Sequence, residues 1–291
     1  MIPTIPPTVT TRDGLALVTR HWPLPKGVAP RGVACLVHGL GEHINRYEHV
    51  AHLLNTWGWA VVGHDHRGHG RSPGGRGRLA HSDDLLHDLA SVLDTVRQAY
   101  PGQRLLLIGH SLGGLIAGRF VAAQAQPPET APWTRPVDLL VMSSPALDPG
   151  LSWFQKTLLA TFGKLTPDLA VPNGLKPEWV CSSPAVVKAY IADPLVHDRA
   201  TGRLSQFIVD AGQHVLQRAP HWTTPTLLLY AGADRCVRPA GSARFGASAP
   251  HAVVTTHAYP RMAHEIFHEP DQAQVFADLA RWLETFEPEP A

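Results

Sequence analysis

Short, almost continuously apolar runs recur along the chain and alternate with segments of helical periodicity. The apolar runs are residues 32–37, 60–63, 104–108, 139–143, 226–230 and 253–258, and the helical segments are 46–57, 83–100, 112–126, 239–247 and 271–286. Strands buried on both faces are apolar along their whole length, and their alternation with helices is typical of a mainly parallel sheet covered on both sides. The pattern therefore predicts an α/β fold.

Two further β-type runs stand near the N-terminus, at residues 8–12 and 15–22, and Asp13-Gly14 lies between them. The Asp-Gly pair favours a type I′ turn, in which both central residues have positive φ. We therefore expect an antiparallel hairpin that completes a mostly parallel sheet of eight strands.

The alternation is interrupted between residues 148 and 222, where the pattern shows helical pieces and no clear strand. We interpret 148–222 as a helical cap inserted into a core formed by 1–147 and 223–291. Within the cap, one helical face carries Leu151, Phe154, Leu158, Phe162 and Leu165. This face predicts a helix that either packs on the main domain or serves as a lid, lining an acyl-chain pocket or touching a membrane surface with help from Lys156, Lys164 and Lys176.

Composition narrows the classes of function. The 291 residues include 17% charged side chains and carry a formal net charge of +1, so the charge balance gives no indication of a nucleic-acid partner. Three scattered cysteines match neither a disulfide framework nor a zinc spacing, and the N-terminal residues lack a secretory signal pattern. We expect a soluble, cytoplasmic protein whose only membrane contact would be peripheral, through the cap. The sequence carries no signal for an oligomeric state.

The strongest chemical signal is the segment Gly109-His110-Ser111-Leu112-Gly113, which follows an apolar strand and opens a helical segment. Such a turn strains the serine backbone and exposes its hydroxyl above the sheet, while the glycines leave no Cβ to collide with neighbouring elements. The N–H of Leu112, at the start of the helix, faces developing negative charge. We predict Ser111 as a nucleophile and the Leu112 N–H as an oxyanion-hole donor.

A second Gly-x-Ser-x-Gly match, Gly70 to Gly74, serves as a control. Its Ser72 follows no apolar strand, and Pro73 has no N–H to donate. We therefore predict that Ser72 is an ordinary loop residue.

The partners expected of a serine nucleophile are present in the right order. After the strand at 32–37, the small Gly39 lets the backbone approach a substrate, so that the Leu40 N–H becomes the second predicted oxyanion donor. Asp234 and His264 follow the strands at 226–230 and 253–258. Asp234 would accept the Nδ1–H of His264, leaving Nε2 to take the Ser111 proton.

Metal chemistry is the rival interpretation. The pattern His-Glu-x-x-His of zinc peptidases is also matched by His264-Glu265-Ile266-Phe267-His268, with Glu284 downstream as a third ligand. However, Pro260 and Pro270 leave room for only a short helix. His64, Asp65, His66 and His69 form another ligand-like cluster, but the surrounding glycines predict a loop. The run Arg67, Arg71, Arg76 and Arg78 either binds an anionic head group or belongs to a solvated loop, and we favour the loop. We expect no catalytic metal and no cofactor.

Together, these motifs resemble those of the α/β-hydrolase superfamily, and within it the monoacylglycerol lipase and lysophospholipase group. The resemblance runs from the first hairpin to the last helix, is weakest in the cap, and includes Arg46-Tyr47, Asp65 to Ser72, Ser143 to Leu147 and Asp193-Pro194-Leu195. It implies that the N–H groups of Leu40 and Leu112 form the oxyanion hole. It also implies a substrate-binding set near the glycerol end and the nucleophile, consisting of Gly39, Glu42, Arg46 and His110.

We therefore expect a serine hydrolase that cleaves the ester of a single-chain acyl lipid, such as a monoacylglycerol or a lysophospholipid, through an acyl-enzyme intermediate. A carboxylesterase for short or medium chains is the first alternative. An aminopeptidase of the same fold would need a site for a free amino terminus, and the cap sequence shows no obvious acidic cluster for it. A zinc metallopeptidase is the remote alternative.

Overall fold

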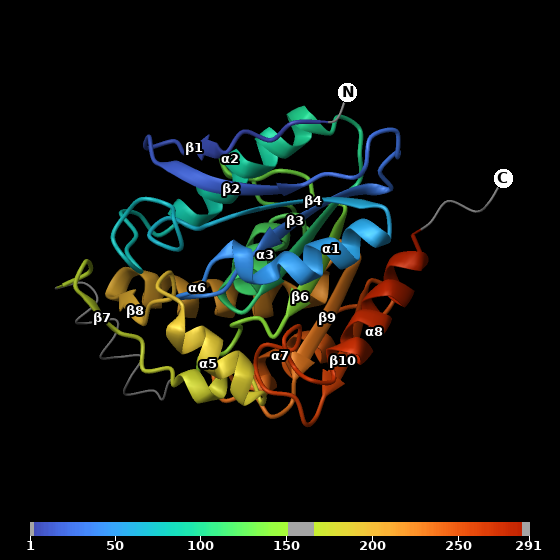
Figure 1. The fold of residues 1–291 in the computed structure, drawn as a ribbon. Coiled ribbons are helices and arrows are strands. Elements are labelled where there is room, and N and C mark those ends of the chain that lie inside the picture. The colour runs from blue at the N-terminus through green and yellow to red at the C-terminus, as the bar shows by residue number, and fades with distance from the viewer. Residues whose placement is uncertain (1–2, 151–165, 287–291) are drawn as a thin grey trace.

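A computed structural model describes residues 3–150 and 166–286 (Figure 1). Eight strands form one sheet in the order β1-β2-β4-β3-β5-β6-β9-β10. The pairs β1/β2 and β2/β4 are antiparallel, and the remaining neighbours are parallel. This confirms the predicted sheet, whose strands are β1 (Thr8–Thr10), β2 (Ala16–Trp22), β3 (Gly32–Val37), β4 (Trp59–His64), β5 (Leu105–His110), β6 (Leu139–Ser143), β9 (Thr226–Ala231) and β10 (Val254–Tyr259).

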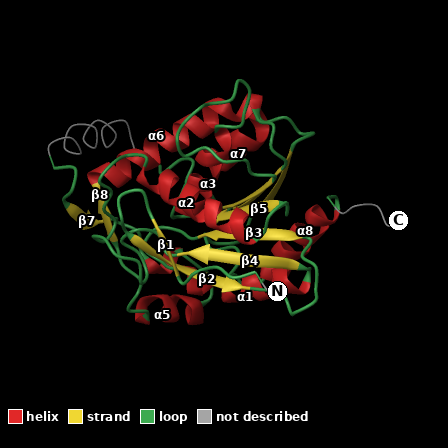
Figure 2. Cartoon of the chain, turned by 90° about the horizontal axis from the view of Figure 1, so that it is seen from above, coloured by secondary structure: helices red, strands yellow, loops and turns green. Residues whose placement is uncertain are grey.

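Helices cover both faces of the sheet (Figure 2). One face packs against α1 (Glu48–Thr56) and α8 (Gln272–Glu284), and the other against α2 (Asp84–Ala99), α3 (Leu112–Ala122), α6 (Gly202–Arg218) and α7 (Pro239–Ser248). In β3, Val33 and Cys35 belong to one hydrophobic cluster while Ala34 and Leu36 belong to the other. Burial on both faces explains why the strand has no polar positions. No helix among the described residues is long and apolar enough to cross a bilayer.

The segment 148–222 differs from its sequence prediction in one respect. It contains a small antiparallel sheet of β7 (Ala170–Pro172) and β8 (Arg199–Thr201), where no strand was expected. Three-residue strands, one of them exposed along its length, are too short to show a period of two. The segment also holds α5 (Pro184–Ala192), while the predicted lid positions Leu151, Phe154, Leu158, Phe162 and Leu165 lie outside the described residues.

Helix α6 is part of the main core. Its apolar side chains Leu204, Phe207 and Val215 belong to the same buried cluster as α3, against which the helix packs. The 148–222 segment therefore supplies both a core helix and the elements that lie beyond the sheet.

The turn of the N-terminal hairpin is not type I′. The Gly14 N–H donates to the Thr11 carbonyl at 3.0 Å and the Thr11 N–H donates to the Leu15 carbonyl at 2.8 Å, but only Gly14 has a positive φ, of 87°. Asp13 keeps an ordinary backbone, and its carboxylate accepts from the Thr11 hydroxyl and from Arg67. The antiparallel hairpin itself is confirmed.

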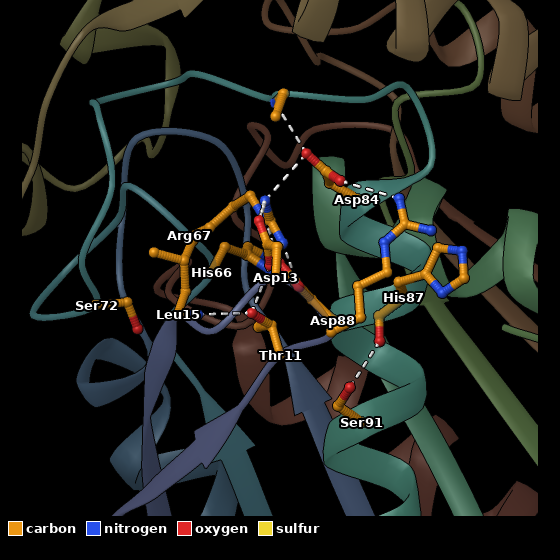
Figure 3. Close-up of polar contacts among 12 residues, drawn as sticks. Thr11, Asp13, Leu15, His66, Arg67, Ser72, Asp84, His87, Asp88 and Ser91 are labelled. Carbon is orange, nitrogen blue, oxygen red and sulfur yellow. Dashed lines mark hydrogen bonds and ion pairs between the residues drawn. The ribbon is translucent and has the colours of Figure 1, made fainter.

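Arg67 overturns the prediction of a solvated loop at its own position. Its side chain is buried and forms ion pairs with Asp13, Asp84 and Asp88 at 3.0, 3.0 and 2.6 Å (Figure 3). These contacts fasten the loop after β4 to the hairpin and to the start of α2. Ser72 is confirmed as a loop residue, since its hydroxyl donates to the Asp65 carbonyl at 2.7 Å and accepts the Val18 N–H at 2.8 Å.

The histidines of the same segment are also buried, and His64 is the last residue of β4 rather than part of a loop. We call His38, His64, His66 and His69 the histidine cluster, because their rings contact one another in the interior. Burial lowers the pKa of His64 to about 4 and, assisted by His197, that of His69 to about 3. Neither ring nitrogen of His64 has a partner among the described residues.

Candidate active site

The predicted nucleophile stands at the sharp turn between β5 and α3. Ser111 has a φ of 53°, and its N–H donates to the Ser143 carbonyl on β6 at 2.9 Å. A Cβ on Gly109 would lie 2.3 Å from the Gly113 carbonyl oxygen, and one on Gly113 would lie 2.0 Å from the Val37 carbonyl oxygen. The glycines of the motif are thus required by the close contact of β3, β5 and α3.

His264 and Asp234 are brought together from the loops after β10 and β9. The distance between His264 Nδ1 and Asp234 Oδ2 is 2.6 Å, and Asp234 Oδ1 accepts the N–H groups of Cys236 and Val237. Burial disfavours a charged His264, but the carboxylates of Asp234, Glu265 and Glu42 outweigh it, so the pKa of His264 lies above its ordinary 6.5. The contact with Asp234 holds a proton on Nδ1 and leaves Nε2 to act as a base.

The loop after β3 lies close to Ser111. A Cβ on Gly39 would approach the Ser111 Cβ to 3.2 Å, so only glycine leaves room here for a substrate carbonyl. Within the described residues, neither the Leu40 N–H nor the Leu112 N–H donates a hydrogen bond to the protein. The His38 Nδ1–H donates to the Gly39 carbonyl at 2.8 Å, and its Nε2 accepts the His66 N–H at 3.0 Å. These bonds fix the loop that carries Leu40.

A buried ion-pair network supports the same loop. Glu42 accepts the Gly39 N–H and the Tyr47 hydroxyl, both at 2.6 Å, and its second oxygen pairs with Arg46. Arg46 also binds Glu265 through two hydrogen bonds of 2.6 Å. Its guanidinium is therefore fully engaged by two carboxylates, and Arg46 acts on the site through Glu42 and Glu265 rather than from the cavity wall.

The zinc-peptidase interpretation is wrong for the described structure. Residues 264–268 form turns rather than a helix, and α8 begins only at Gln272. The three side chains of the motif point to different partners: His264 to Asp234, Glu265 to Arg46, and His268 to the Arg46 carbonyl oxygen at 3.1 Å.

The cap contacts the loop after β3 (residues 39–43) at two points. The Asp193 carboxylate lies 2.8 Å from His43 Nε2, and the His197 N–H donates to the Gly41 carbonyl at 2.8 Å. A Cβ on Gly41, whose φ is 77°, would lie 2.2 Å from the His197 carbonyl oxygen. The segment 193–198 therefore depends on a glycine at position 41 for its contact with the core.

Two cavities meet at Ser111. The larger, of about 390 Å³, is bounded by Gly39, His110 and His264 on the core side and by residues of 173–198 on the cap side. The smaller, of about 160 Å³, is lined mainly by apolar groups, including Leu112, Ala146 and Ile208. Both cavities also share Leu40 and Cys236. A substrate ester at Ser111 can thus place one end in each.

The larger cavity is more acidic than the sequence indicated. Asp193 and Asp198 from the cap line it together with Glu42 and Glu265 from the core. The cap sequence by itself shows no obvious acidic cluster, and only the fold brings its two aspartates together with the two glutamates of the core.

The structure gathers most of the predicted site residues around one cavity. Ser111, His264, Gly39, Leu40, Glu42 and His110 line it, whereas Asp234 lies behind His264 and Arg46 lies behind the two glutamates. The His110 ring lies 4.8 Å from that of His264, and its Nδ1 contacts the Ser143 hydroxyl at 3.0 Å. Three further residues that line this cavity were not predicted from the sequence: Cys236, Tyr190 and His197. Of these, the sequence indicates only Cys236, which stands two residues after Asp234.

Comparison with known proteins identifies the family of the chain. Residues 28–271 match the model of the family described as serine aminopeptidase, S33. The chain belongs to this family. A monoacylglycerol lipase of Mycolicibacterium smegmatis is 34% identical over 257 residues, which cover 87% of this chain and 88% of that protein.

Solved structures give the same picture. The crystal structure of Paleococcus ferrophilus monoacylglycerol lipase has a TM-score of 0.79 at 34% identity, covering 93% of this chain and 99% of that one. A monoglyceride lipase from Saccharomyces cerevisiae in complex with a substrate analog has a TM-score of 0.82 and covers 98% and 96%, but at 22% identity it supports the fold alone. The α/β-hydrolase fold, the resemblance to the monoacylglycerol lipase group and the class of carboxylic ester hydrolase are confirmed.

Proposed function

We propose that this protein hydrolyses monoacylglycerols, with Ser111 as nucleophile, His264 as base and Asp234 as the acid that orients it. The observation that carries the proposal is the position of Ser111 where two cavities meet, the larger with several charged and polar side chains in its wall and the smaller mainly apolar, beside two N–H groups that have no partner among the described residues. An ester with one polar and one aliphatic end matches this arrangement. The triad comes from the core of 1–147 and 223–291, and residues of 173–198, within the 148–222 segment, supply the outer wall of the larger cavity.

The reaction follows from the proposed roles. His264 Nε2 takes the Ser111 proton as the hydroxyl oxygen attacks the acyl carbonyl, and the Leu40 and Leu112 N–H groups stabilise the tetrahedral oxyanion. The imidazolium then protonates the leaving glycerol oxygen. Water, deprotonated by the same nitrogen, attacks the acyl-enzyme and releases the fatty acid. No step in this sequence draws on a cofactor.

The larger cavity favours a head group without negative charge. Glu42 and Glu265 line it and share the single positive charge of Arg46, which leaves net negative charge between them, and Asp193 is paired with His43. Carboxylate oxygens accept hydrogen bonds from glycerol hydroxyls, whereas they repel the phosphate of a lysophospholipid. The smaller cavity, with Leu112, Ala146 and Ile208, suits the acyl chain.

An aminoacyl substrate is the second candidate. The four carboxylates of the larger cavity are a suitable environment for the ammonium group of a free amino terminus. Arg46 offsets one of these negative charges, and the smaller, mainly apolar cavity suits an acyl chain, which is why we rank this candidate below the neutral monoacylglycerol.

Peripheral contact of the cap with a lipid surface forms part of the proposal. Leu169, Val171 and Ile191 are exposed on the cap, and Ile191 also borders the larger cavity. Exposed apolar side chains on the cap, one of them at this cavity, would bring the enzyme to lipid dispersed in a membrane. Flotation with phosphatidylcholine vesicles tests this: we expect Leu169→Ser with Ile191→Ser to abolish binding, and unchanged flotation would contradict it.

A substrate panel tests the proposed function. Initial rates on monoacylglycerols, lysophospholipids, p-nitrophenyl esters of increasing chain length and aminoacyl amides should be highest for monoacylglycerols. Ser111→Ala should remove turnover on all of them while thermal unfolding stays near that of wild type, because the side chain change leaves the turn intact. Near-normal turnover in Ser111→Ala would overturn the assignment, and a preference for aminoacyl amides would favour the second candidate.

A further inference from the structure

Three side chains with metal-ligating atoms converge beside the proposed nucleophile. A carboxylate oxygen of Asp234, the Sγ of Cys236 and a ring nitrogen of His264 all lie within 4.8 Å of one another. Across residues 3–150 and 166–286, no other group of three histidine, cysteine or acidic side chains meets this condition. Two of the three belong to the proposed triad, and the cysteine has no part in the proposed reaction.

The turn after β9 creates this convergence. Asp234 Oδ1 accepts the N–H of Cys236 at 2.8 Å and that of Val237 at 3.0 Å, which folds the chain around the carboxylate. Cys236 is thereby held next to Asp234, while Asp234 Oδ2 holds His264 from the loop after β10. The three groups come from two loops whose relative position is fixed by parallel pairing of β9 and β10.

A small cation can reach the thiol. Cys236 lines both cavities together with Ser111, although only 9% of its surface is exposed. Glu42 and Glu265 line the larger cavity and add negative charge, offset in part by Arg46. Arg235, the basic residue of the same turn, has its guanidinium 5.0 Å from the Trp179 ring centre, stacked on that ring. The lining thus favours the entry of a cation over that of an anion.

We propose that Asp234, Cys236 and His264 form an inhibitory site for a thiophilic divalent cation, of which Zn²⁺ and Cd²⁺ are the probes. Thiolate sulfur, imidazole nitrogen and carboxylate oxygen are the donors that zinc takes in proteins, at about 2.0–2.3 Å. Tetrahedral coordination at those lengths places ligand atoms roughly 3.5 Å apart. The Asp234 Oδ2 and His264 Nδ1 atoms, now 2.6 Å apart, would move apart to reach this spacing, and the Cys236 Sγ, within 4.8 Å of its partners, would move closer.

Binding removes the base from the reaction. The Cys236 thiol loses its proton to solvent, the Asp234 carboxylate and one His264 nitrogen each donate a lone pair to the cation, and no electron is transferred. If the cation takes Nε2, the base is blocked directly. If it takes Nδ1, the Nδ1 proton moves to Nε2, which can then no longer act as a base, and the contact with Asp234 is broken. Inhibition rests on the proposed triad, whereas binding of the cation does not.

Binding is tested separately from activity. Cd²⁺ titration of Ser111→Ala, followed by the ultraviolet cadmium–thiolate absorption band and by calorimetry, should show one Cd²⁺ per chain. Cys236→Ser in the same background should lose the band. Cys181→Ser should keep it, because Cys181, although in the same buried cluster as Cys236, lines neither cavity and donates to the His268 carbonyl. A band that persists in Cys236→Ser, or that never forms, would overturn the site.

Inhibition is then measured on the wild-type serine enzyme with a p-nitrophenyl ester. Each variant is normalised to its own metal-free rate, and EDTA should restore activity, which separates coordination from oxidation of the thiol. Cys236→Ser should raise the half-inhibiting Zn²⁺ concentration by roughly tenfold or more, since losing even an outer partner of a site weakens it about that much. Equal inhibition of Cys236→Ser and wild type would overturn the proposal. Cys236→Ala provides a second variant if Cys236→Ser has an altered circular dichroism spectrum.

Discussion

His64→Leu should stabilise the protein, and the gain should grow as the pH falls. His64 closes β4 in the middle of the histidine cluster, with none of its surface exposed. Both ring nitrogens lack a partner among the described residues, and a buried, unsatisfied polar group destabilises by about 1–3 kcal/mol. Leucine has a similar volume and no polar atom, so we expect a gain of roughly 1 kcal/mol at pH 7.5.

The pH dependence follows from the lowered pKa. The pKa of His64 is about 4 in the folded chain because of burial, against 6.5 in an unfolded one. Above pH 6.5 both states are neutral. Below pH 6.5 the histidine binds a proton in the unfolded chain but not in the folded chain. The free energy of unfolding therefore falls by about 1.4 kcal/mol per pH unit until the pH reaches the pKa of His64 in the folded chain. Between pH 7.5 and pH 5 this amounts to about 2 kcal/mol, which the leucine variant does not lose.

Urea unfolding followed by tryptophan fluorescence measures both effects. The difference in free energy of unfolding between variant and wild type should be larger by about 2 kcal/mol at pH 5 than at pH 7.5. His81→Leu is the matched control, because His81 is exposed and its substitution should give the same difference at both pH values. A pH-independent difference for His64→Leu would refute the argument that the buried ring stays neutral.

Three further substitutions probe other parts of the structure. Arg67→Ala leaves Asp88 buried without its partner and should lower the free energy of unfolding, measured in urea, by about 3–5 kcal/mol. Arg78→Ala, at an exposed position, is the control, and an equally small change in both variants would contradict this prediction. The acid limb of the pH profile of kcat/KM should have its midpoint above pH 6.5, because the pKa of His264 is raised. Glu265→Gln should shift this midpoint to lower pH. A wild-type midpoint below pH 6.5 would be inconsistent with the carboxylates around His264. Gly113→Ala should lower the thermal midpoint and the activity together, because its Cβ would lie 2.0 Å from the Val37 carbonyl oxygen. Gly75→Ala is the control, since its Cβ meets only the flexible Arg78 side chain, and equal effects of the two variants would refute the packing argument.

The sheet and the nucleophile turn could be predicted because their causes are local. A strand such as β3, which alternates between two cores, must be apolar throughout, and that requirement is visible in six consecutive residues. The glycines around Ser111 are likewise demanded by contacts between consecutive elements. Chain order then indicated Asp234 and His264, whose loops follow parallel strands.

Long-range polar contacts could not be predicted in the same way. Arg67 pairs with Asp13, 54 residues earlier, and Asp88, 21 residues later, and nothing in a Gly-rich segment indicates that its charge will be buried. The pairing of Glu265 with Arg46 spans 219 residues. Burial of a polar residue depends on partners that only the tertiary structure supplies, so local composition predicted a solvated loop.

The attachment of the cap has a consequence for engineering of this enzyme. Asp193 and His197 contact His43 and Gly41, within the loop that presents Leu40 to the nucleophile. An exchange of the cap for that of a relative, made to change the acyl specificity, would remove the outer support of that loop unless residues 39–43 were exchanged with it. The two segments form one interchangeable unit, although some 150 residues separate them in the sequence.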